Sequence, residues 1–171
     1  MSEKYQHTDA GKQLTKLTLE IFRTNGLFLD IGNILTARHG LTSARWQVMG
    51  AIDYAENPLS VAQIARLMGL TRQSVQRTVN DLEDLGMVEL RDNASHKRAR
   101  LVHLTREGEL AQEKVNQSQV LWSNEAAADI NSALLADFVA TLKQVRKKTE
   151  AFRVRFVKAQ KLAAATANKS I

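Results

Sequence analysis

Apolar side chains recur at alternating intervals of three and four residues near both ends of the chain. This spacing places them along one side of a helix, as in helices that pack lengthwise against a partner. The two runs therefore predict two long helices, and each apolar seam needs a partner, either within the chain, as in a monomeric bundle, or on a second copy. The seam residues are Leu14, Leu17, Ile21, Phe28, Ile31 and Leu35 in the first helix and Leu135, Phe138, Leu142, Val145, Phe152 and Phe156 in the second.

Residues that break helices are scarce. The chain contains one proline, Pro58, and none of the 63 residues after Gly108 is glycine or proline. Because nothing interrupts a helix there, we expect the C-terminal part to form long helices. Gly26 and Gly32 fall within the N-terminal seamed helix, where they predict a bend or a close packing contact.

The middle of the chain carries the signals of shorter helices. Thr42 or Ser43 can cap a helix that carries Trp46 and Met49 and ends before Pro58. After this helix, residues that begin and end helices follow one another at shorter intervals, which predicts shorter helices.

Two short helices follow Pro58. Ser60 and Gln63 have the spacing of a capping box and open a helix that runs to residue 68. Gly69 allows a tight turn, Thr71 caps the next helix, and Gly86 ends it. Two short helices joined by a glycine-containing turn predict a helix-turn-helix.

A β-hairpin is predicted directly after this motif. Residues 88–91 alternate as a strand, residues 92–98 form a polar loop, and residues 99–104 read as the returning strand before Thr105 caps another helix. A helix-turn-helix followed by a hairpin with a basic loop is the layout of a winged helix. The expected fold is mainly α, with a small β-hairpin wing.

In the helix after Thr71, an apolar stripe at positions 75, 79 and 82 faces the core and turns the polar side chains outward. Arg can form two hydrogen bonds with guanine, and Asn or Gln can do so with adenine. We therefore expect four side chains of this helix to reach base edges: Gln73, Gln76, Arg77 and Asn80. At the helix start, Thr71, Arg72 and Ser74 are suited to phosphate. The alternative is that all of these are merely solvated polar residues.

Arg77 has one competing partner within its own helix. Asp81 lies four residues on, and an exposed pair at this spacing contributes about 0.3 to 0.5 kcal/mol. A bidentate base contact contributes roughly 1 to 3 kcal/mol. We therefore expect Arg77 to bind a base in the DNA complex and not Asp81.

Charge is distributed unevenly along the 171 residues. The net charge is +6, but residues 143–171 alone hold nine basic groups and one acidic group. Residues 60–106 hold eight basic and five acidic groups, and residues 107–142 hold one basic and six acidic groups. The total suggests a polyanionic partner. The C-terminal basic block is either the solvated side of a helix or a source of non-specific DNA attraction from Arg153, Arg155, Lys158 and Lys161.

Several function classes find no support in the sequence. There is no cysteine, so thiol chemistry is excluded, and the four histidines have no metal-ligand spacing, so we expect no metal and no cofactor. No glycine-rich phosphate loop or hydrolase motif is present, so we do not expect an enzyme. Residues 1–12 are polar, and no apolar stretch approaches the roughly 20 residues of a membrane span, so we expect a cytoplasmic protein without membrane contact.

Four segments resemble the MarR family of bacterial transcription regulators, in the family's order. They are LTSARWQV at residues 41–48, LSVAQIA at residues 59–65, a helix from SVQR at residue 74 to LEDLGMV at residue 88, and LTREG at residues 104–108. The resemblance covers roughly residues 12–158. It implies a homodimer with interlocked terminal helices, a winged helix per subunit on a pseudo-palindromic operator in double-stranded DNA, and release by a small phenolic or anionic effector.

The resemblance also implies a division of the chain. Residues 1–41 would form an N-terminal dimerisation region, residues 42–106 the winged helix, residues 107–158 the C-terminal dimerisation helices, and residues 159–171 a flexible basic tail. The expected dimer contacts are Leu14, Leu17, Ile21, Leu135, Phe138, Leu142, Val145, Phe152 and Phe156. The expected DNA contacts are Ser60, Thr71, Arg72, Gln73, Ser74, Gln76, Arg77, Asn80, His96, Lys97, Arg98 and Arg100.

Two positions depart from the family pattern. Relatives commonly carry Asp-Arg where this chain has Asn80 and Asp81, and an acidic residue before the two basic residues of the wing tip where this chain has His96. An ion pair between an acidic side chain and the wing-tip arginine, which the family pattern implies, is therefore not expected here. The differences predict a wing that is more mobile or more cationic than in relatives. Because histidine gains charge in mildly acidic solution, we expect tighter operator binding there.

By analogy with the family, an effector pocket is expected near the junction of the first two helices. Its expected lining is Phe22, Arg38, His39, Arg45, Trp46 and Met49, in which basic groups would meet an anion and aromatic rings would stack. Two alternatives remain open: a regulator without an effector, and a winged helix that binds an acidic protein instead of specific DNA.

Overall fold

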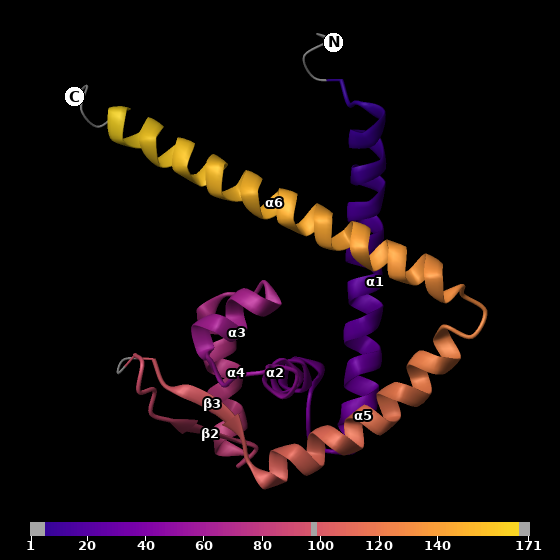
Figure 1. The fold of residues 1–171 in the computed structure, drawn as a ribbon, viewed down its shortest axis with the longest axis vertical. Coiled ribbons are helices and arrows are strands. Elements are labelled where there is room, and N and C mark those ends of the chain that lie inside the picture. Colours follow the sequence, from indigo (N-terminus) through magenta and orange to yellow (C-terminus); the bar gives the residue numbers. More distant parts are fainter. Residues whose placement is uncertain (1–5, 97–98, 168–171) are drawn as a thin grey trace. The chain divides into compact units, whose positions relative to one another are not determined.

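The computed structural model describes residues 6–96 and 99–167, and it is mainly helical, as the sequence predicts (Figure 1). The chain divides into two compact units, Met1–Trp122 and Ser123–Ile171. Within the described residues, the elements in chain order are α1 (Asp9–Ala37), α2 (Ser43–Asp53), β1 (Leu59–Ser60), α3 (Val61–Met68), α4 (Arg72–Asp84), β2 (Val88–Arg91), β3 (Leu101–Leu104), α5 (Arg106–Ala126) and α6 (Ser132–Ala167).

The predicted helix caps are confirmed by local hydrogen bonds. The hydroxyl oxygen of Thr42 accepts from the backbone N–H of Arg45 at 3.3 Å, and that of Thr71 accepts from Ser74 at 3.1 Å. At the start of α3, the backbone N–H of Ser60 donates to Oε1 of Gln63 at 2.8 Å. Each bond satisfies a donor that the first turn of a helix would otherwise leave unpaired.

The wing belongs to a three-stranded antiparallel sheet with the strand order β1-β3-β2. The predicted strand at residues 88–91 is confirmed, whereas the returning strand begins at Leu101 and not at residue 99. Strand β1 was not predicted, because its two residues carry no strand pattern of their own. Leu59 is extended because it pairs with Val102, which is a tertiary contact.

The core of the first unit lies beneath the helix-turn-helix and the sheet. The predicted apolar stripe of α4 is confirmed, since Val75, Val79 and Leu82 are fully buried. They pack with core residues from α2, α3, β3 and α5, which are Val48, Met49, Ile64, Val102 and Val115. Burial of this stripe fixes which side of α4 faces outward.

The start of α5 is held tightly against the turn between α4 and β2. Thr105 donates its hydroxyl to the carbonyl oxygen of Gly86 at 2.6 Å and accepts from the backbone N–H of Gly108 at 3.1 Å. A Cβ atom at Gly108 would overlap the carbonyl oxygen of Met87. Glycine at this position therefore permits the close approach of α5 to the end of the helix-turn-helix.

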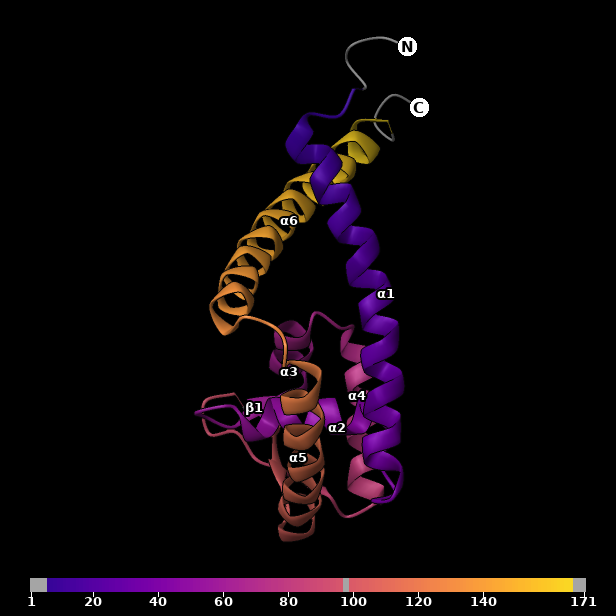
Figure 2. The same cartoon turned by 90° about the vertical axis from the view of Figure 1, so that its right-hand side faces the viewer.

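Helix α1 packs against α2 through its C-terminal half (Figure 2). The predicted close contact occurs at Gly32, where a Cβ would overlap the hydroxyl of Ser43, whereas nothing lies within 4 Å of a Cβ at Gly26. The Asn33 side chain accepts from the backbone N–H of Ser43 at 2.9 Å. Further along the unit, the rings of Phe28 and Trp122 meet edge to face, with centroids 5.7 Å apart.

Much of the two predicted seams is exposed in the single chain. Leu14 and Phe28 of α1 are exposed, as are Leu135, Phe138, Phe152 and Phe156 of α6. Helix α6 continues to Ala167, past residue 158. In the part of the chain that the structure describes, no helix combines the length and apolar character that a membrane span requires.

Candidate nucleic-acid interface

The polar surface of α4 forms the candidate interface. Because the apolar stripe of the helix is buried, Thr71, Arg72, Gln73, Ser74, Arg77 and Asn80 are exposed, and Gln76 is half-buried. The structure therefore brings seven of the expected DNA contacts together on one helix and its cap.

Two amide side chains on this surface are joined. Nε2 of Gln76 donates to Oδ1 of Asn80 at 2.8 Å, one helical turn away. Such a pair restricts the rotamers of both side chains. Their remaining donors and acceptors are thereby held in a defined orientation, which suits an edge of a base.

Asp81 turns away from Arg77. Its Oδ2 atom lies 3.5 Å from Nη2 of Arg45 on α2. Within residues 6–96 and 99–167, Arg77 forms no ion pair. The competition from Asp81 that the sequence suggested is therefore absent, because a residue on another helix takes the carboxylate.

A hollow of about 210 Å³ lies between α4 and the wing. Its lining includes Arg72 and Gln76 from α4, Arg100 from the wing and Ser60 at the start of α3. Two guanidinium groups beside the beginning of a helix form a favourable site for an anion such as a phosphate group. The hydroxyl of Ser60 is already used, since it donates to Oε1 of Gln63 at 2.7 Å.

The wing tip is described only in part. Lys97 and Arg98 lie outside the described residues. His96 is exposed, and its backbone N–H donates to the carbonyl oxygen of Asn93 at 3.1 Å. At the base of the wing, the guanidinium of Arg100 donates to the carbonyl oxygen of Leu90, and Arg91 forms an ion pair with Glu89.

The six residues expected around an effector differ in burial and in their contacts, and they do not line one common cavity in the described part of the chain. Met49 is fully buried in the core, Phe22 is exposed, and Arg45 is engaged by Asp81. Arg38 is exposed beside His39, whose pKa is lowered below its ordinary value by burial and by the charges of Arg38 and Lys114. Of the six, Trp46 lines a cavity described in this structure.

The sequence reasoning missed a cavity between α2 and α5. Its walls carry Asp53, Glu109, Gln112 and Glu113. The α5 residues recur at helical spacing and share one face, which is the signal that could have identified them. Asp53 could not have been added without the tertiary structure, because it comes from another helix.

Comparison with known proteins places the chain among transcription regulators. A sequence model described as the MarR family matches residues 39–99. An uncharacterised protein of Mycobacterium tuberculosis is 34% identical over 123 residues, which cover 72% of this chain and 85% of that protein. The transcriptional activatory protein BadR of Rhodopseudomonas palustris is 26% identical over 115 residues, which cover 66% of each protein.

The fold is shared with solved structures. The crystal structure of CouR from Rhodococcus jostii RHA1, bound to p-coumaroyl-CoA, matches with a TM-score of 0.69 at 19% identity. The match covers 75% of this chain and 90% of CouR, and it shows the fold alone. Together with the family match across the winged helix, these findings establish that the chain belongs to the MarR family of DNA-binding transcription regulators.

Proposed function

We propose that this MarR-family regulator binds a pseudo-palindromic operator as a homodimer in the cytoplasm and represses transcription until a small aromatic or anionic effector releases it. The observation that carries the DNA-binding part is the exposed polar surface of α4 beside the hollow that Arg72 and Arg100 flank. Arg77 reads a guanine, and the Gln76–Asn80 pair reads an adjacent base edge. Arg72, Ser74 and Arg100 hold phosphates.

The exposed seams of α1 and α6 support a dimer. Large apolar side chains along two helices are rarely left in water, and a two-fold dimer buries the same seam on both subunits. Two copies of α4 then present the same surface to two half-sites, which is why the operator is a palindrome. Phe138→Glu on the seam should give monomers in sedimentation, whereas Val154→Glu, which is exposed and off the seam, should leave dimers.

The aromatic part of the effector proposal is supported by Trp46, which lines a cavity. The anionic part has less support, since Arg38, His39 and Arg45 line none of the described cavities. CouR was solved bound to p-coumaroyl-CoA, and BadR is a transcriptional activatory protein. A reporter gene with and without the protein distinguishes repression from activation.

The central test selects bound fragments from random DNA with the purified full chain. We expect one palindromic sequence, bound with a Kd of about 10⁻⁸ M or tighter, and no comparable binding to scrambled DNA. Arg77→Ala should relax the preference at one base position, whereas Arg23→Ala on α1, which is exposed and paired with Glu20, should keep it. Equal binding to every sequence would favour the alternative, a winged helix that docks an acidic protein.

A further inference from the structure

Two buried polar atoms lack a hydrogen-bond partner within the described residues, and both lie where α2 and α5 meet. They are Nε1 of Trp46 on α2 and Oε1 of Gln112 on α5. Gln112 is only 2% exposed, and its Nε2 atom donates to Oδ1 of Asn116 at 3.2 Å. An unpaired buried acceptor is unusual in proteins, and a bound molecule that donates to it is one explanation.

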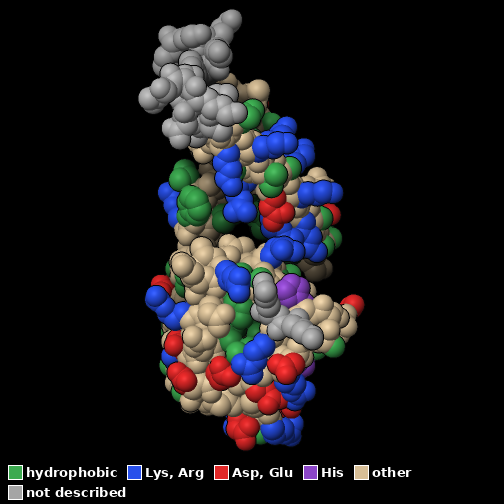
Figure 3. Space-filling view, turned by 90° about the vertical axis from the view of Figure 1, so that its left-hand side faces the viewer, with side chains coloured by type: hydrophobic (Ala, Val, Ile, Leu, Met, Phe, Trp, Pro, Cys, Tyr) green, Lys and Arg blue, Asp and Glu red, His purple; other side chains and the backbone are tan. Residues whose placement is uncertain are grey.

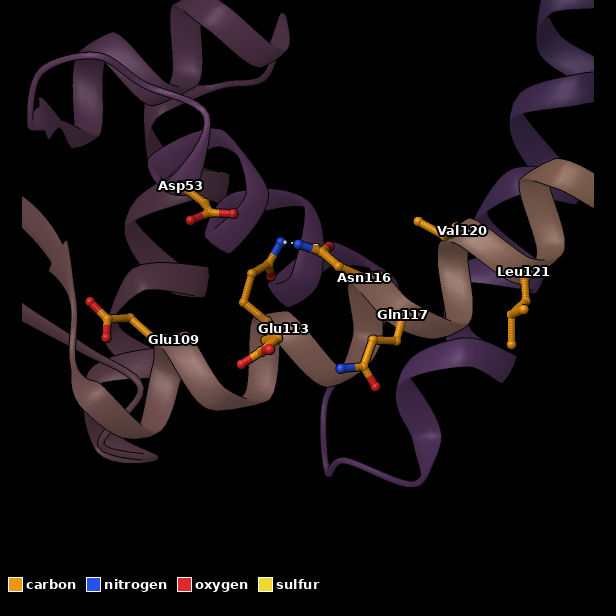
Figure 4. A pocket seen from close by; sticks show the side chains of 8 residues that line it. Asp53, Glu109, Glu113, Asn116, Gln117, Val120 and Leu121 are labelled. Atoms are coloured by element: carbon orange, nitrogen blue, oxygen red, sulfur yellow. Dashed lines mark hydrogen bonds between the residues drawn. The ribbon is translucent and has the colours of Figure 1, made fainter.

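Gln112 lines a cavity of about 620 Å³, which is the size of many small-molecule sites. Figure 4 shows Asp53 on α2 across from the α5 residues Glu109 and Glu113. Val120 and Leu121 lie at the other end of the same cavity. One end is thus acidic, and the other is apolar.

The charge of this cavity has one sign. No lysine, arginine or histidine is among its lining residues. Arg106 lies outside the lining and pairs with Glu109 at 3.3 Å, which leaves Asp53 and Glu113 without a described ion pair. In residues 6–96 and 99–167, no cluster of three or more His, Cys, Asp or Glu could hold a metal ion, so the carboxylates are too dispersed for a bare cation.

We infer that this cavity binds an organic cation, an amine or amidinium carried on an apolar body. The carboxylates attract the positive group, whose N–H donors supply the missing partner of Gln112, and the apolar body lies on Val120 and Leu121. The lining carries three carboxylates and no cationic side chain, which disfavours an anion. That this ligand acts as an effector rests on the proposed function of the chain as a transcription regulator.

A second cavity lies beside the first one and shares two of its lining residues. Gln112 and Asn116 also line a space of about 250 Å³ together with Trp46 and Gln47 of α2. The hydrogen-bonded amide pair is therefore adjacent to both cavities. An N–H donor that binds Gln112 in the first cavity therefore contacts a side chain that also lines the second cavity with Trp46.

Isothermal titration of the full chain with matched probes tests this inference. Tryptamine and phenethylamine carry the cation, and 3-indolepropionate and 3-phenylpropionate carry a carboxylate on the same apolar bodies. We expect both amines to bind saturably and both acids to fail. The inference is overturned if neither amine binds at millimolar concentration, or if the acids bind as well as the amines.

Exposed carboxylates allow a variant that should still fold. Asp53→Asn with Glu113→Gln should weaken amine binding roughly tenfold or more. Glu125→Gln, an exposed carboxylate of α5 outside the cavity lining, is the matched control and should bind as the wild type does. Gln112→Met, which keeps the volume and removes the acceptor, should also weaken binding. Unchanged affinity in the double variant would reject the site.

The readouts keep this inference separate from the proposed function. Titration needs no DNA, so amine binding by a protein that recognises no operator would retain the site and reject the regulator. Conversely, a specific operator complex with no amine binding would retain the regulator and reject the site. Amine binding that leaves operator affinity unchanged would reject the effector role.

Discussion

Arg45 on α2 and Asp81 on the candidate recognition helix α4 form an ion pair, with Nη2 and Oδ2 3.5 Å apart. The family commonly has arginine at the position of Asp81, so the pair accompanies a departure of this chain from the usual pattern. Both side chains are partly exposed, 28% for Arg45 and 45% for Asp81, so solvent screens the attraction. Its main effect is orientation, since it ties α4 to α2 and leaves Arg77 without a carboxylate partner.

The first prediction concerns this pair. Asp81→Asn should change the free energy of unfolding by less than about 1 kcal/mol, because the pair is screened. Operator affinity should fall more, because the neutral amide no longer holds Arg45 and α4 loses a contact that orients it. Urea denaturation and gel shift measure the two effects. The exchange Arg45→Asp with Asp81→Arg should recover part of the affinity, and failure to recover any would assign the loss to the individual side chains.

The second prediction separates base readout from phosphate contact. Arg77→Ala should cost about 1 to 3 kcal/mol of operator affinity and relax the preference at one base position. Arg100→Ala, in the hollow beside the wing, should weaken all sequences evenly and lower the salt slope by about one. Titration on a set of single-base operator variants at several salt concentrations distinguishes them. Identical profiles for the two variants would show that the assigned surface is wrong.

A third prediction compares two glycines within helices. Gly108→Ala should destabilise the chain by about 1 to 3 kcal/mol, because the added Cβ overlaps the backbone carbonyl of Met87. Gly26→Ala is the matched control. It has open space around the Cβ and should stabilise by about 0.5 to 1 kcal/mol. Denaturant midpoints of both variants test this contrast, and equal shifts of the same sign would contradict it.

The fourth prediction follows from His39. Burial and the charges of Arg38 and Lys114 lower the pKa of His39 below 6.5, so the folded chain binds this proton less readily than the unfolded chain. The contribution of His39 to stability is therefore complete above pH 6.5 and is lost as the pH falls through the lowered value. Unfolding of the wild type and His39→Gln between about pH 7.5 and 5 should show a smaller acid-side loss in the variant. If the free energy of unfolding depends on pH in the same way in both proteins, His39 does not contribute to the acid-side loss of stability.

The fifth prediction addresses the basic side of α6. Residues 143–161 of α6 carry eight Lys and Arg side chains, and Figure 3 shows Lys and Arg side chains gathered on the upper part of the face that it draws. If this side attracts DNA, replacing Arg153, Arg155, Lys158 and Lys161 with Gln should flatten the salt dependence of binding and keep the base preference. Filter binding across a salt series measures this slope. A slope equal to that of the wild type would leave these residues as a solvated face.

Contacts that span a few residues could be read directly from the sequence. Thr42, Thr71 and Thr105 cap helices because a hydroxyl reaches a backbone N–H within its own turn. The stripe at Val75, Val79 and Leu82 is buried as expected, because helical periodicity alone places these side chains on one face. The winged helix and its outward polar surface follow from such local rules.

Contacts between distant residues were decided by the tertiary structure. Leu59 forms a strand only because it pairs with Val102. The Asp81 side chain forms its ion pair with Arg45 of another helix and not with Arg77 of its own helix. Asp53 meets Glu113 across a cavity because α2 and α5 pack on one core. Sequence spacing reports which side chains share a helix face, whereas the partner of that face depends on how the helices pack. The sequence by itself therefore determined the helices, the wing hairpin and the outward polar surface of α4. The tertiary structure decided strand β1, the Arg45–Asp81 ion pair behind that surface and the acidic cavity.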